Sequence, residues 1–280
     1  MADIRKTNKV VLILLYTIVI LFTVLTIYPV FWLIIQSFKT TQEYMTSSKL
    51  AFPKMWFFNN YPISWRTGNF STLIFNSVIY TSVTVVSIII FSFMAAFAFA
   101  KLPSKVTPYL HGSFIIGILI TIQCIMVPLF LFINAVGLYN SRLGVLVPYI
   151  GIGLPMAVYL ATAYIKSIPD EVIESARIDG AKYISIFRRI IMPMAAPVAA
   201  TVAILSVTGT WNEFMLINIL VSSNRLKSLP VGINMFSGTL ASDYGKQFSA
   251  LVIGMIPMLV FYAIFRKQIT KGVSAGAVKG

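Results

Sequence analysis

The sequence predicts an all-α integral membrane protein with six transmembrane helices, a helix-turn-helix loop between the fourth and fifth, and both termini in the cytoplasm. The first observation is composition: 58% of the 280 residues are hydrophobic and only 11% are charged, whereas about a quarter of the residues in a soluble domain are charged. The second is the grouping of apolar residues into six runs near the roughly 20 residues that cross a bilayer. The third is one long polar segment, residues 167–197, between two of these runs.

The first predicted span covers residues 10–35. Arg5, Lys6 and Lys9 precede it, as basic residues precede the core of a signal peptide. The apolar run is too long for a cleavable signal, however, because such a core has only about 7 to 15 apolar residues. The following loop, residues 39–71, contains several Pro and Asn residues, and its Trp, Phe and Tyr side chains suit a membrane interface.

The second and third predicted spans cover residues 72–100 and 110–135. The second span ends in alternating Ala and Phe at residues 95–100. Small residues let helices approach closely in lipid, so we expect this end to pack against a neighbouring helix. Pro128 interrupts the third span, and neighbouring groups must satisfy the carbonyl that it leaves free.

The remaining predicted spans cover residues 144–166, 198–220 and 248–265. An outer loop at residues 222–247 separates the last two, and a short, flexible, basic tail follows at residues 266–280. All of these elements form a single transmembrane domain that covers residues 1–280.

The polar segment 167–197 predicts a helix, a glycine turn and a second helix. Pro169 fits the first helical position, and the acidic residues after it suit the positive end of a helix dipole. Gly180 ends the first helix because it adopts the left-handed conformation without steric cost. Apolar residues then recur at helical spacing from Tyr183 to Ile191, and this second amphipathic helix ends near Pro193.

This segment contains three short motifs at a distinctive spacing: Glu174-Ser175-Ala176, Asp179-Gly180-Ala181 and Ile191-Met192-Pro193. They resemble the EAA loop of the permeases of ABC importers, with Ser175 and Met192 in place of the usual Ala and Leu, so we call residues 167–197 the EAA-like loop. The resemblance implies that the first loop helix is a coupling helix that docks on a cytoplasmic ATPase. Glu174 would then make an ionic contact, with Ser175 and Ala176 allowing close approach. The alternative is a solvated amphipathic connector with no special role.

Residues 51–65 contain an F-P and a later N-Y, a pattern that resembles a segment of carbohydrate permeases. The tail Gly276-Ala277-Val278-Lys279-Gly280 resembles the end of the second permease subunit of the carbohydrate-uptake branch, the maltose permease type. The resemblance implies that the tail contacts the ATPase subunits. The alternative is a disordered anchor attracted to anionic lipid.

The partners that the resemblance implies are a second, similar permease, a dimer of ATPase subunits and an extracytoplasmic solute-binding protein. The chain would then take up a carbohydrate, an oligosaccharide by preference, across a bacterial inner membrane. ATP and Mg would bind in the partner ATPase, so this chain itself would bind no cofactor and catalyse no reaction. Its other contacts would be with sugar and membrane lipid.

Asn212 and Glu213 are candidate residues of the substrate pathway or its gate. Glu213 is the one carboxylate inside a predicted span, and ionisable groups in lipid are costly enough to suggest function. The alternative is a structural anchor at the wet outer end of the span. The surrounding Trp-Asn-Glu-Phe pattern also occurs in the resembled family and does not decide between the two roles.

Charge distribution predicts the orientation. More of the 22 Lys and Arg residues fall on the side of the termini and of the EAA-like loop than on the other side, and the side richer in them is cytoplasmic. Juxtamembrane Lys and Arg therefore explain the net charge of +14, and we expect no nucleic-acid partner. Cys124 and His111 are each alone, so no disulfide or metal site is expected.

Other classes of transporter remain as alternatives. An ion-coupled secondary transporter usually carries intramembrane carboxylates or histidines and often an internal repeat, and here there is one edge carboxylate and no obvious repeat. An ABC permease for a non-sugar solute is the other alternative. The sequence does not identify the sugar.

Overall fold

The computed structural model describes residues 9–102, 104–238 and 243–277, and all regular structure in that part of the chain is helical. The prediction of an all-α protein is therefore confirmed for these residues. The elements in chain order are α1 (Lys9–Gln36), α2 (Thr41–Thr46), α3 (Asn60–Thr67), α4 (Phe70–Lys101), α5 (Thr107–Ile118), α6 (Ile122–Ala135), α7 (Arg142–Lys166), α8 (Glu171–Ile178), α9 (Tyr183–Ile186), the π-helical turn η2 (Phe187–Ile191), α10 (Met192–Met194), α11 (Ala196–Trp211), α12 (Met215–Leu220), α13 (Leu229–Gly238) and α14 (Tyr244–Ala277).

Four of these helices are long and apolar enough to cross a membrane: α1, α4, α7 and α14. Two further candidates are bent pairs, namely α5 with α6, which are bent by 106°, and residues 183–194 with α11, which are bent by 76°. Among the described residues, length and composition thus allow four to six spans.

The third predicted span is wrong as a continuous helix, because the chain breaks between Ile118 and Ile122. The break lies in a run of β-branched residues, which lowers helix propensity. Thr121 has an extended conformation there, and its hydroxyl donates to the sulfur of Cys124 at 3.2 Å. Pro128, in contrast, lies inside α6 and does not end it.

The fifth and sixth predicted spans also have different bounds. Residues 212–214 separate α11 from α12, so residues 198–220 do not form one helix. Helix α14 continues past residue 265 to Ala277, where a flexible tail was predicted. The predicted loops contain short helices as well: α2 and α3 within residues 39–71, and α13 within residues 222–247.

The chain divides into two compact units, which we describe separately: residues 1–69 with 233–257, and residues 70–232 with 258–280. In the first unit, α1 exposes apolar side chains all around its axis. The loop that follows α1 is held by the buried side chain of Asn60 in α3, which donates to the carbonyls of Ser37 (2.7 Å) and Lys39 (2.9 Å). Gly245 of α14 lies so close that a Cβ atom there would be 2.5 Å from the Lys39 carbonyl oxygen. This contact fixes the loop to the first turn of α14.

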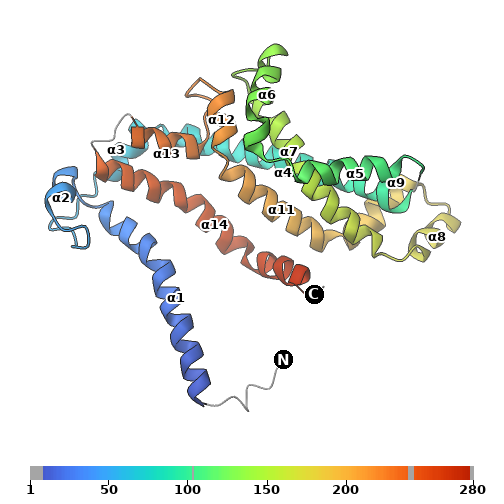
Figure 1. Cartoon of the computed structure of the whole chain (residues 1–280), viewed down its shortest axis with the longest axis horizontal. Coiled ribbons are helices and arrows are strands. Elements are labelled where there is room, and N and C mark those ends of the chain that lie inside the picture. Colours follow the sequence, from blue (N-terminus) through green and yellow to red (C-terminus); the bar gives the residue numbers. More distant parts are fainter. Residues whose placement is uncertain (1–8, 103, 239–242, 278–280) are drawn as a thin grey trace. The chain divides into compact units, whose positions relative to one another are not determined.

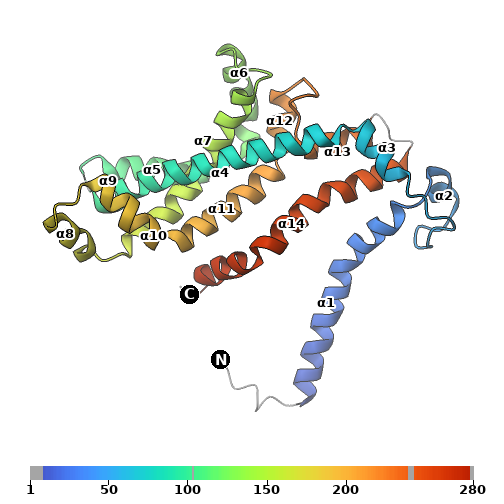
Figure 2. The same cartoon turned by 180° about the vertical axis from the view of Figure 1, so that it is seen from behind.

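The second unit is built on α4 and α7, which pack along each other more extensively than any other pair of described helices, with α11 against both. Gly153 of α7 permits this approach, since a Cβ atom there would lie 2.3 Å from Cδ1 of Ile88. The small-residue end of α4 is buried at Ala96 and Phe97, which confirms the packing predicted for it. Figures 1 and 2 show α9 at this end of α4, away from the end at which α4 begins.

Candidate functional site

The EAA-like loop begins with the amphipathic helix α8. Ile173 and Ala176 are buried in the core of the second unit, whereas Glu174 and Ser175 are exposed. Ile178, at the end of the helix, is 86% exposed. The helix therefore has one face against its own chain and another, with a carboxylate and an apolar side chain, open for a partner.

Ala176 differs from its expected role. It was expected to allow a partner to approach closely, but it is only 9% exposed and packs in the same apolar cluster as Ile165 and Ile191. The same cluster contains residues of α4 and α7, such as Phe97 and Ala161. Of the two residues proposed for close approach, only Ser175 lies on the open face.

The turn after α8 has the conformation predicted from Gly180, whose φ angle is +78°. The amide of Ala181 donates to the carbonyl of Ala176 at 2.9 Å, and the amide of Gly180 donates to that of Arg177 at 3.0 Å. Together these bonds form the glycine C-cap known as the Schellman motif. A Cβ atom at Gly180 would meet nothing within 4 Å, so the need for glycine is conformational rather than steric.

The second part of the EAA-like loop is helical from Tyr183 to Met194, as predicted, but it contains an unexpected π-helical turn at η2. Ile186 and Ile191 are fully buried in this part. Pro193, which has no amide hydrogen, is the second residue of α10, directly after Met192, and the chain then bends into α11. The loop is thus attached to the long helices at both of its ends.

Glu213 lies in the break between α11 and α12, where it caps α12. Its Oε2 atom accepts a hydrogen bond from the Tyr149 hydroxyl at 2.6 Å and another from the Ile217 amide at 3.2 Å, while Oε1 accepts from the Leu216 amide at 2.7 Å. The amides at a helix start have no partner within the helix, and a carboxylate is favoured there. This capture explains why the predicted fifth span is broken.

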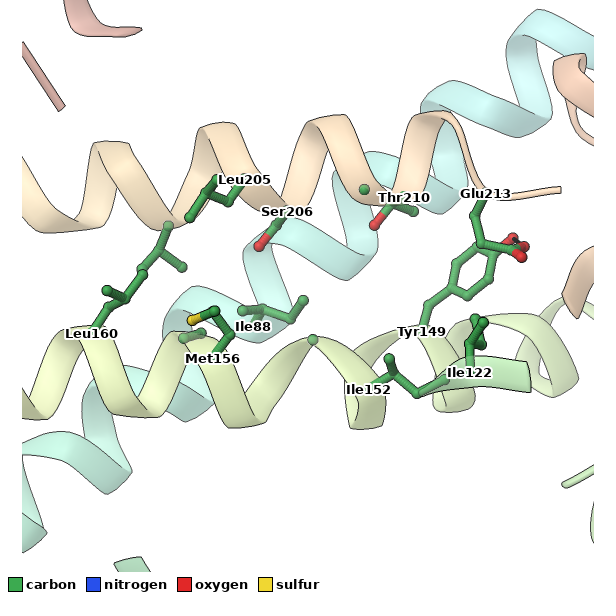
Figure 3. Close-up of a pocket in the computed structure, with 14 residues that line it drawn as sticks. Ile88, Ile122, Tyr149, Ile152, Met156, Leu160, Leu205, Ser206, Thr210 and Glu213 are labelled. Atoms are coloured by element: carbon green, nitrogen blue, oxygen red, sulfur yellow. Dashed lines mark hydrogen bonds between the residues drawn. The ribbon is translucent and has the colours of Figure 1, made fainter. Parts of the chain in front are cut away.

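A cavity of about 260 Å³ lies beside Glu213 in the second unit. It is lined mostly by apolar side chains of α4, α7 and α11, together with four polar ones: Tyr149, Ser206, Thr210 and Glu213. Figure 3 shows Tyr149 and Glu213 together at one end of the cavity and Leu160 with Leu205 at the other.

Asn212, the other pathway candidate, does not line this cavity. Its side-chain amide donates to the carbonyl of Thr208 in the preceding helix, α11, at 2.9 Å. The sequence analysis also missed Tyr149, Ser206 and Thr210. The available signal was a set of hydroxyl-bearing residues within apolar spans, but nothing in the sequence alone pairs Tyr149 with Glu213, 64 positions away.

Other predicted features have less structural context. Gly276 and Ala277 end α14, while Val278, Lys279 and Gly280 lie outside the described residues. Within residues 9–102, 104–238 and 243–277, no group of three or more His, Cys, Asp or Glu side chains has a geometry suited to a metal ion.

These features define a class of protein: a helical membrane protein in which a helix-turn-helix loop with an exposed polar face joins two long apolar segments. Residues 89–274 match the family described as binding-protein-dependent transport system inner membrane component. The chain belongs to this family, the membrane permeases of ABC importers, which confirms the family predicted for the chain.

Individual relatives match over nearly the whole chain. The multiple sugar-binding transport system permease protein MsmG of Streptococcus mutans is 31% identical over 279 residues, which cover 98% of this chain and 100% of that protein. The trehalose transport system permease protein SugB of Mycobacterium tuberculosis is 32% identical over 254 residues, with 90% and 92% covered. The fold is shared with a bacterial ABC transporter involved in the import of the acidic polysaccharide alginate, with a TM-score of 0.82, 21% identity, and coverage of 95% of this chain and 99% of that one.

Proposed function

We propose that this permease transports a carbohydrate that an extracytoplasmic binding protein delivers to it, and that this carbohydrate is an oligosaccharide. Relatives that match nearly the whole chain transport multiple sugars or trehalose by their names, which supports a sugar substrate. The observation that carries the mechanism is the open face of α8, a helix held at a fixed angle by Gly180 and attached to the long helices on both sides.

The proposed topology has six spans, with the termini and the EAA-like loop in the cytoplasm. The spans are α1, α4, the bent pair α5–α6, α7, α11 and α14. The excess of Lys and Arg on the side of the termini supports this orientation. The EAA-like loop then faces the compartment that contains ATP.

The proposed partner on α8 is a cytoplasmic ATPase subunit, one of two that bind ATP and Mg and serve this chain and a second, similar permease. Glu174 makes an ionic contact with the ATPase in this scheme. An exposed ion pair contributes only about 0 to 1 kcal/mol, so most of the affinity must come from burying the helix in a groove. Ile178 supplies exposed apolar surface for such burial. We also propose that the tail, Gly276 to Gly280, contacts the ATPase pair.

The cavity beside Glu213 supports a place for this residue on the sugar's path. Tyr149, Ser206, Thr210 and Glu213 bring hydroxyl and carboxylate groups to an otherwise apolar wall. Such groups exchange hydrogen bonds with sugar hydroxyls when the cavity opens. Asn212, which is exposed, acts in this scheme at the outer edge of the break, as part of the gate rather than of the wall.

The first test is the composition of the complex that an N-terminally tagged chain retains in mild detergent. We expect one ATPase species and a second permease in a ratio of two to one to one. The variant Glu174→Arg should insert normally but lose the ATPase and sugar uptake. Glu171→Arg is the matched control, because Glu171 is also an exposed carboxylate on α8. Normal uptake by Glu174→Arg would remove this residue from the mechanism.

A second measurement separates this proposal from an ion-coupled transporter. Proteoliposomes that contain the complete complex should transport sugar only when ATP is present on the side of the membrane that carries the ATPase and binding protein is present on the opposite side. Uptake by the purified chain alone under an ion gradient, without ATP, would contradict the proposal.

A further inference from the structure

Helix α4 holds the EAA-like loop at its Lys101 end through a buried ammonium group. The Lys101 side chain is only 3% exposed. Its Nζ atom donates to the carbonyl of Ile168 and to the carboxylate of Asp170, the latter at 2.6 Å. A buried charge is costly unless it is paired and hydrogen-bonded, and both partners lie in the few residues that connect α7 to α8. Lys101 therefore fixes the start of α8 to the end of α4.

Apolar contacts reinforce this joint. The rings of Phe97 in α4 and Phe187 in η2 lie 5.6 Å apart. Phe93 and Ala96 belong to the same buried cluster as Ile173 of α8 and Ile191 of η2. Both helical parts of the EAA-like loop thus rest on one end of α4.

The opposite end of α4 also holds another segment, the chain between α12 and α13, through side-chain hydrogen bonds. The buried Asn76 side chain donates to the carbonyls of Arg225 (2.8 Å) and Lys227 (3.0 Å), and it accepts from the guanidinium of Arg142 at 2.9 Å. The Tyr80 hydroxyl donates to the Leu226 carbonyl at 2.8 Å. The Ser77 hydroxyl accepts from the backbone amide of residue 229 at 2.9 Å.

Between its two ends α4 is the least interrupted of the core helices in this unit. Its 32 residues include neither Pro nor Gly, the residues at which helices bend most sharply. Helix α7 contains Pro148 and Pro155, and α11 stops at the break before α12. Figures 1 and 2 show α4 as one continuous helix. Asn76 and Lys101 are 25 positions apart, which corresponds to about 37 Å at the α-helical rise of about 1.5 Å per residue.

We propose that α4 is the element that transmits motion between the EAA-like loop and residues 225–229, with Lys101 as the positioning residue at one end and Asn76 and Tyr80 at the other. The inference rests on the proposed function, in which α8 binds the ATPase and residues 225–229 lie on the side of the binding protein. A rigid element attached at both ends moves both ends together, whereas the bent helices can absorb a displacement. Closing the ATPase would therefore reposition the surface that meets the binding protein.

The test uses the complete importer in proteoliposomes and measures how much the sugar-loaded binding protein stimulates ATP hydrolysis. We expect Lys101→Met to keep the ATPase in the complex but to lose at least about fivefold of this stimulation, the lower end of typical coupling between sites. Lys101→Arg, which keeps a charged donor, should restore most of it. Lys105→Met is the control, because Lys105 is exposed just beyond the same end of α4.

The other end of α4 provides an independent and milder variant. Tyr80→Phe removes only the hydroxyl that holds the Leu226 carbonyl, and we expect a smaller loss of stimulation. Tyr159→Phe, on the exposed side of α7, is its matched control. The double variant Lys101→Met/Tyr80→Phe should lose no more of this stimulation than Lys101→Met alone. Once one end of α4 no longer transmits motion, weakening the other end has no further effect on the stimulation. If the two substitutions instead acted by destabilising the fold at two separate sites, their losses of stimulation would add.

Three results overturn the inference. Full stimulation in Lys101→Met, or in Tyr80→Phe if Lys101→Met fails to insert, shows that α4 does not carry the signal. Additive losses in the double variant show that the two ends act separately. A wild-type complex without an ATPase, or with no response to the binding protein, overturns the proposed function itself, and this outcome is distinguishable because it precedes any substitution.

Discussion

The EAA-like loop and the segment around Glu213 both interrupt apolar helices with charged residues, yet their charges face different surroundings. Glu174 is exposed on α8, so its carboxylate is free to meet another subunit. Glu213 is bound within its own chain by the Tyr149 hydroxyl and by two backbone amides at the start of α12. The comparison shows that a carboxylate in an apolar segment indicates a partner only when no hydrogen-bond donors of its own chain bind it.

The largest expected effect comes from Glu213→Ala. The substitution leaves the buried amides of Leu216 and Ile217 and the Tyr149 hydroxyl without an acceptor, and each unsatisfied buried group costs roughly 1 to 3 kcal/mol. We expect a loss of at least about 3 kcal/mol, measured by denaturant titration in detergent. Asn212→Ala is the control and should change stability by less than about 1 kcal/mol, since the exposed Asn212 side chain donates to a carbonyl in the last turn of the preceding helix, α11. Equal losses in both variants would contradict the capping role.

Tyr149→Phe should have the next largest effect. It removes one hydrogen bond to a carboxylate, worth about 1.5 to 3 kcal/mol, and keeps the ring that packs edge-on against Tyr80. The same titration measures this loss. If Tyr149→Phe is neutral, the two backbone amides alone hold Glu213, and its carboxylate is more available to substrate than we infer.

Gly180→Ala tests the EAA-like loop, and we expect a smaller effect than for the substitutions at Glu213 and Tyr149. A non-glycine residue in the left-handed conformation costs about 1 to 2 kcal/mol, and no steric clash adds to this because the site is open. We expect the free energy of unfolding to fall by about this amount and the ATPase to be retained more weakly on a column. Gly180→Asn should be milder, because Asn tolerates this conformation better than other residues. An ATPase lost equally from both variants would argue for a specific contact at Gly180.

Ser175→Ala should have the smallest effect. The hydroxyl is exposed and donates only to the Val172 carbonyl of its own helix at 3.2 Å, so stability should stay within about 0.5 kcal/mol of the wild type. Assembly with the ATPase should also be unchanged, because alanine at this position preserves close approach. Ser175→Trp should abolish assembly if the open face of α8 enters a groove, and full assembly of that variant would argue against the groove.

The two regions also differ in how far the sequence predicted them. The EAA-like loop follows from local signals, namely a glycine turn, flanking amphipathic helices and a family pattern, and the structure has each of these elements at the expected residues. Ala176 is the exception, because whether a small residue faces a partner or its own core depends on how α8 lies against α4 and α7. That arrangement is set by tertiary contacts.

The breaks at residues 119–121 and 212–214 were not predicted because no Gly or Pro marks them. The second depends on Tyr149, which lies in another helix and 64 positions away. The pairing of Lys101 with Asp170 spans 69 positions and is equally invisible to helical periodicity. Local pattern predicts where apolar segments and turns lie, but it does not predict a helix end such as Trp211, where a long-range hydrogen bond holds the residue that caps the next helix.

Helix α1 has one further consequence, which concerns the thickness of the membrane. Its 28 residues form a helix about 42 Å long, whereas the hydrocarbon core of a typical bilayer is about 30 Å thick. In the proposed topology, in which α1 spans the membrane, the helix must therefore tilt, or its ends must extend among the lipid headgroups. Its sequence contains no Gly, Ala or Ser, and its three Thr hydroxyls donate to carbonyls of the same helix, so none of these hydroxyls donates to a neighbouring helix. Exchanges among Leu, Ile and Val in α1 should therefore be silent, while the activity of the importer should respond to the acyl-chain length of the lipid that surrounds it.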